Sequence, residues 1–100
     1  MIDISPEQKD IIHKILEEHI PDRKVMAFGS RTSPEPKSYS DLDLAIMGDK
    51  VVDFGTLALL KDAFAESDLP FRVDLIQWCR TSPEFRKVIE PQLKPIDQSY

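Results

Sequence analysis

The sequence is poor in the residues that build redox or soft-metal sites: its 100 residues include one cysteine and two histidines. Cys79 alone cannot close an internal disulfide, which argues against the disulfide-rich secreted class. His13 and His19 are six residues apart, whereas two helical histidines that chelate a metal lie four apart. We therefore expect any bound metal to be held by oxygen ligands.

Long apolar runs and basic charge are also scarce. No run approaches the roughly 20 residues that cross a bilayer, and the start of the chain lacks the basic region of a signal peptide. We therefore expect no membrane contact and a cytoplasmic location. The net charge of −5 argues against an extended DNA or RNA interface. A small anionic ligand remains compatible, because a divalent cation reverses the local field.

Three segments begin with residues that cap helices, and apolar side chains follow each one at helical spacing. The first helix, over about 6–20, has Ser5 as its cap and Gln8 as the partner in a capping box. Asp53 predicts a second helix over about 54–67. The third opens at Thr81-Ser82-Pro83-Glu84, which supplies cap residues and an early proline, and Pro91 and Pro95 prevent a long continuation. Its expected apolar residues are Phe85, Val88 and Ile89, and the tail beyond it is expected to be extended.

Three shorter segments, 24–28, 41–47 and 71–78, show the apolar content and alternation of strands. A loop joins the first two, which predicts an antiparallel pair, and a helix precedes the third. The order helix, strand, strand, helix, strand, helix predicts an α/β (α+β) fold with a small mixed sheet and helices packed on one side. The length and the 41% apolar content favour a single domain over residues 1–100.

The most informative stretch begins with Gly29-Ser30 at the end of the first predicted strand and closes, ten residues later, with Asp41-Leu42-Asp43. A glycine there lets backbone N–H groups approach an anion, and Ser30 adds a hydroxyl donor. Strand alternation places Asp41 and Asp43 on one face, with Cα atoms roughly 6.6 Å apart. At an effective dielectric of about 20, their charges repel by roughly 3 kcal/mol, which cations would offset.

A third aspartate, Asp74, interrupts the apolar sequence of the third predicted strand. Strand interiors disfavour aspartate, and a half-buried carboxylate needs partners. If the third strand lies beside the second, Asp74 completes a cluster with Asp41 and Asp43. Three carboxylates without histidine or cysteine ligands favour Mg²⁺ first and Mn²⁺ second.

Together, the Gly-Ser pair, the ten-residue spacing and the Asp-x-Asp motif resemble the signature of the DNA polymerase beta-like nucleotidyltransferase superfamily. The short chain is similar, more narrowly, to the minimal nucleotidyltransferases encoded beside HEPN-domain proteins, the MntA-type antitoxins. The resemblance implies a palm-like core and a reaction that moves AMP from ATP to a hydroxyl, namely a tyrosine of a HEPN toxin bound in a hetero-oligomer.

The resemblance also implies roles for individual residues. Asp41, Asp43 and Asp74 are the expected catalytic residues and metal ligands. Gly29 and Ser30 are expected to hold the β and γ phosphates, and Arg31 or Lys37 to add positive charge beside them. The loop departs from the family pattern, because Pro34 and Pro36 stand where family members often have small residues, a difference that bears on loop motion and turnover.

Two other functions are compatible with the sequence. The chain can act as a binding module that neutralises its partner by occlusion, using exposed apolar residues of the last helix and tail. Transfer to RNA or to a small molecule is less favoured, because the chain is acidic and no substrate-binding domain accompanies the motif.

Overall fold

The computed structural model describes residues 4–29 and 41–96. These residues form three helices, four strands and two short 3-10 helices. In chain order they are α1 (Pro6–His19), β1 (Val25–Phe28), β2 (Leu42–Ile46), α2 (Phe54–Ala65), β3 (Val73–Gln77), η2 (Trp78–Arg80), α3 (Pro83–Ile89), η3 (Glu90–Gln92) and β4 (Lys94–Pro95). This arrangement confirms the predicted α/β class.

The sheet has the strand order β3-β2-β1-β4. β1 pairs antiparallel with β2, as predicted, and the crossover through α2 makes β3 parallel to β2. The sheet is therefore mixed, with both predicted neighbours beside β2.

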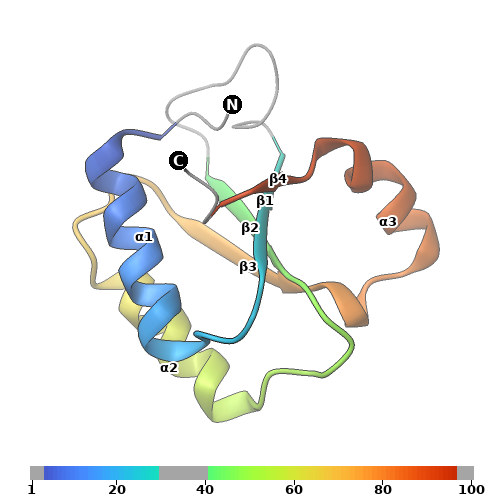
Figure 1. The fold of residues 1–100 in the computed structure, drawn as a ribbon, viewed down its shortest axis with the longest axis horizontal. Helices are drawn as coiled ribbons and strands as arrows, with labels where there is room; N and C mark the ends of the chain where they lie inside the picture. Colours follow the sequence, from blue (N-terminus) through green and yellow to red (C-terminus); the bar gives the residue numbers. More distant parts are fainter. Residues whose placement is uncertain (1–3, 30–40, 97–100) are drawn as a thin grey trace.

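One face of the sheet carries the larger apolar core. Alternate residues of β2, including Leu42 and Leu44, are fully buried and pack against Ile12 of α1 and Leu60 of α2. The predicted capping box starts α1, since the Ser5 hydroxyl accepts from the Gln8 N–H and the Gln8 side chain accepts from the Ser5 N–H. In Figure 1, α1 and α2 lie together on one side of the strands.

The other face of the sheet is covered only in part. A smaller cluster, in which Phe28, Ala45 and Ile89 are buried, joins the sheet to the α3 region, and Trp78 packs against it. Figure 1 shows α3 on the side of the sheet away from α1 and α2, so the helices do not all share one side. Because Ala45 lies on this face, so does Asp43, two positions before it.

The C-terminal region differs from the sequence-based expectation. Its residues were expected to form an extended tail, but Lys94 and Pro95 pair with Ala27 and Met26 as the edge strand β4. The apolar side of α3 is also narrower than expected, because Ile89 is buried whereas Val88 is 65% exposed. Among the described residues, no helix has the length and apolar character needed to cross a membrane.

Candidate active site

The parallel pairing of β2 and β3 brings two of the three predicted aspartates together. Asp43 and Asp74 are register partners in neighbouring strands, and Asp41 precedes β2 by one residue. Asp43 is half-buried, whereas Asp41 and Asp74 are exposed at the surface. All three carboxylates are thus at the end of the sheet where β2 and β3 begin.

The electrostatics of Asp43 reflect this crowding. Burial raises the pKa of its carboxyl above the ordinary value of 3.8, and the negative charges of Asp74 and then Asp41 raise it further. An opposite charge close to a carboxyl group favours its ionised form. A cation beside Asp43 would therefore offset the effect of the neighbouring aspartates.

Gly29, at the end of β1, is required by the position of Asp43. Its φ of +88° lies in the region that favours glycine, and a Cβ there would lie 2.3 Å from Asp43 Oδ2. The Gly29 N–H donates to Gln92 Oε1 at 3.0 Å, a contact with η3 that the sequence did not predict. Ser30, Arg31 and Lys37 lie outside the described residues, so their predicted phosphate contacts remain predictions.

A hollow at the β3 edge of the sheet opens beside the aspartates. Asp43 and Asp74 line it together with Phe28, Phe85, Lys61 and three apolar residues of β3, Val73, Leu75 and Ile76. The rings of Phe28 and Phe85 meet edge to face, with centroids 6.4 Å apart. Two carboxylates, apolar side chains of β3 and the aromatic pair of Phe28 and Phe85 therefore border one space.

The donors at this site suit a hard divalent cation. Within residues 4–29 and 41–96, no group of three or more histidine, cysteine or acidic side chains converges closely enough to enclose a metal by itself. Mg²⁺ often binds through only one or two carboxylates and takes its other ligands from water and substrate phosphates. The pair formed by Asp43 and Asp74, with Asp41 beside it, matches that donor set.

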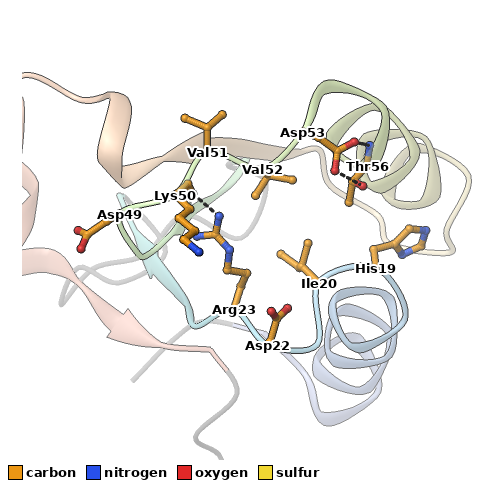
Figure 2. A pocket seen from close by; sticks show the side chains of 10 residues that line it. All are labelled: His19, Ile20, Asp22, Arg23, Asp49, Lys50, Val51, Val52, Asp53 and Thr56. Atoms are coloured by element: carbon orange, nitrogen blue, oxygen red, sulfur yellow. Dashed lines mark hydrogen bonds between the residues drawn. The ribbon is translucent and has the colours of Figure 1, made fainter.

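A second hollow lies at the opposite end of β2, between the end of α1 and the start of α2 (Figure 2). Two of its polar side chains, Arg23 and Asp53, are hydrogen-bonded within the chain. Arg23 donates to the carbonyl of Met47 at 2.8 Å and to that of Lys50, and Asp53 accepts from the Thr56 N–H and hydroxyl. These bonds hold the loop between β2 and α2, so this hollow is a structural feature and the aspartate cluster is the better candidate site.

Comparison with known protein families matches residues 10–96 to the family described as polymerase beta, nucleotidyltransferase. A curated relative from Haemophilus influenzae, described as the probable protein adenylyltransferase MntA, is 50% identical over 88 residues. The aligned region covers 88% of this chain and 77% of that relative.

Two solved structures share the fold. The toxin–antitoxin complex MntA-HpeT, in a form with two aspartates replaced by glutamate, matches with a TM-score of 0.70 at 23% identity, over 91% of this chain and 73% of that chain. An MNT antitoxin in complex with the tri-AMPylated HEPN toxin of Shewanella oneidensis matches with a TM-score of 0.65 at 23% identity, over 93% and 71%. The architecture of Figure 1 is therefore that of MNT antitoxins.

Proposed function

This chain belongs to the polymerase beta nucleotidyltransferase family, and from that premise we propose that it is a protein adenylyltransferase that transfers AMP from ATP to a hydroxyl of a HEPN toxin. The acceptor is a tyrosine, and the chain is the antitoxin of the pair. Support comes from the relative that is 50% identical and named for this activity. Because ATP is the donor, we place the reaction in the cytoplasm.

The observation that carries the proposal is the register of β2 and β3. It places Asp43 beside Asp74, while the missing Cβ of Gly29 leaves room for the Asp43 carboxylate. Burial and the neighbouring charges of Asp74 and Asp41 raise the pKa of Asp43, so the carboxylate form is disfavoured there. A divalent cation bound together with the nucleotide would supply positive charge at this point, which supports the proposal.

In this proposal, Asp41, Asp43 and Asp74 would hold Mg²⁺, with Mn²⁺ as a substitute. The metal, when bound, supplies charge stabilisation for the phosphates during displacement. Gly29, whose missing Cβ leaves room for the Asp43 carboxylate, would hold the β and γ phosphates together with Ser30, and Arg31 would add positive charge beside them; Ser30 and Arg31 lie outside the described residues.

The transfer itself is a single displacement at the α-phosphorus of ATP. The acceptor oxygen forms a bond to that phosphorus as the bond to the bridging oxygen breaks, and pyrophosphate leaves with the electron pair. Asp74, which is exposed at the start of β3, accepts the proton of the acceptor hydroxyl. Asp43, held in place by its half-buried position, orients the nucleotide.

The decisive experiment incubates the chain with ATP labelled at the α-phosphate, Mg²⁺ and the HEPN toxin of its own pair. The wild-type chain should label the toxin, and the double variant Asp41→Asn with Asp43→Asn should lose at least about 1,000-fold in rate, because both carboxylates act on the transferred group. Asp49→Asn is the matched control, since Asp49 is an exposed aspartate of the β2–α2 loop outside the site.

Two results would argue for the binding-module alternative. One is the absence of label on the toxin when folded wild-type protein and saturating ATP are present. The other is full protection of cells from the toxin by the double variant, because occlusion does not need the carboxylates.

A further inference from the structure

We propose that the hollow beside Asp74 is the acceptor pocket and that Phe85 is a positioning residue for the aromatic ring of the acceptor side chain. The inference rests on the proposed function and specifies where the toxin segment enters. It is carried by the side chains that line this hollow, Asp74 and Phe85 among them, and by the order of the strands.

The strand order decides which side of the site receives the acceptor. Gly29 ends β1, Asp43 is on the central strand β2, and Asp74 is on β3 at the edge of the sheet. An in-line displacement requires the attacking and leaving oxygens on opposite sides of the phosphorus. If the β and γ phosphates lie at the Gly29 corner, the acceptor oxygen approaches from the β3 side, where the hollow opens.

The lining of the hollow suits an aromatic side chain better than a second anion. Asp43 and Asp74 outnumber Lys61, so the lining is net negative and disfavours further phosphate on this side. Phe28 and Ile76, in contrast, provide an apolar floor on the face of the sheet that carries Asp74. An acceptor with an apolar ring and a terminal hydroxyl can pack on this floor and present its oxygen to Asp74.

Phe85 is the residue most suited to hold such a ring. It lies on α3 at the rim of the hollow, is 39% exposed, and is fixed from below by its edge-to-face contact with the buried Phe28. A fixed, partly exposed ring offers a second ring an edge-to-face or offset-stacked contact. The fold already holds Phe85 in the position that the contact needs.

The test is the steady-state kinetics of labelling with the HEPN toxin as the varied substrate and ATP saturating. Phe85→Ala should raise the KM for the toxin about tenfold, the effect of one lost aromatic contact, and leave the KM for ATP unchanged. Phe85→Leu keeps an apolar side chain against Phe28 but has no ring, and should show most of the same loss. Phe85→Tyr keeps the ring and should restore the wild-type KM.

Phe54→Ala is the matched control, because Phe54 is 87% exposed on α2 and does not line the hollow. Its KM for the toxin should equal that of wild type. A rise in the KM for ATP in Phe85→Ala would place the nucleobase at this rim and overturn the inference, as would an unchanged KM for the toxin. Failure of the wild-type protein to label the toxin at all would instead overturn the proposed function.

Discussion

The polar groups at the two ends of β2 have different surroundings. At its C-terminal end, Arg23 binds two loop carbonyls and Gln77 accepts from the Val52 N–H at 2.6 Å. At its N-terminal end, Asp41, Asp43 and Asp74 crowd together with like charge.

Two carboxyl groups express this difference directly. Hydrogen bonds from Thr56 lower the pKa of Asp53 beyond the C-terminal end of β2, whereas burial and neighbouring aspartates raise the pKa of Asp43 at the N-terminal end. The contact between the His13 and Glu17 side chains, whose Nδ1 and Oε2 atoms lie 3.8 Å apart on α1, involves neither group. At one end a carboxyl group is stabilised by hydrogen bonds from the chain, and at the other a carboxyl group lies among like charges; our proposal assigns the bound cation and nucleotide to this second end.

The largest expected effect is that of replacing Gly29, the glycine beside the N-terminal end of β2. Gly29→Ala introduces a Cβ at a φ of +88°, 2.3 Å from Asp43 Oδ2. The collision displaces the carboxylate, so labelling of the toxin should fall at least about 100-fold, because misplacement of a reacting group by 1 Å has an effect of that order. Stability should also fall by about 1–2 kcal/mol, measured by urea unfolding.

Gly48→Ala is the matched comparison at the other end. Gly48 has a φ of +111°, and its added Cβ would meet Arg23 Nη1 at 2.7 Å. We expect a similar loss of stability but normal labelling per folded molecule. Equal losses of activity in the two variants would show that the ends do not differ in function.

Removal of the Arg23 side chain tests the C-terminal end of β2. Arg23→Ala leaves the carbonyls of Met47 and Lys50 without their charged donor. Hydrogen bonds to charged groups contribute about 1.5–3 kcal/mol, so unfolding free energy should fall by about 2 kcal/mol. Lys14→Ala, at an exposed position of α1, should change it by less than about 0.5 kcal/mol. Lost activity in folded Arg23→Ala would contradict a purely structural role.

Asp43→Asn tests the crowded end through its pH dependence. Because the folded-state pKa of Asp43 lies above 3.8, the folded protein holds this proton more tightly than the unfolded chain, and wild type loses stability as pH rises through that range. At pH 7 the asparagine variant should therefore be more stable, by about 1 kcal/mol or less.

The advantage should disappear below pH 3.8, where the carboxyl is protonated in both states. Thermal melts of both proteins between pH 3 and pH 7 measure it directly. Added Mg²⁺ should raise the melting temperature of wild type more than that of the variant. A variant less stable than wild type at pH 7 would show that the charge of Asp43 is compensated within the chain.

Local patterns in the sequence were sufficient for one set of features. Alternation placed Asp43 opposite the buried Leu42 and Leu44, and cap residues located the start of each helix, because both signals act between residues close in sequence. Asp74 is a charged residue within an apolar run and needs partners, which correctly suggested that β3 lies beside β2.

Features that depend on distant residues were missed for a physical reason. The bond from Gly29 to Gln92 joins residues 63 positions apart, and β4 is two residues long and includes Pro95. A proline cannot donate a backbone hydrogen bond to a neighbouring strand, although an edge strand tolerates it. A strand of two residues is also too short to show a periodic pattern in the sequence. The exposure of Val88 likewise depends on how far α3 reaches over the sheet, which its own periodicity cannot specify.

The smallest expected effect uses the third glycine, which needs no special conformation. Gly55 is in the first turn of α2, beyond the C-terminal end of β2, and an added Cβ would meet Asp53 Oδ2 at an ordinary 3.5 Å. Alanine costs less backbone entropy than glycine in a helix, so Gly55→Ala should stabilise the protein by about 0.5 kcal/mol with unchanged labelling of the toxin. Urea unfolding measures the gain, and a loss of stability would mean that the contact with Asp53 disturbs the helix cap.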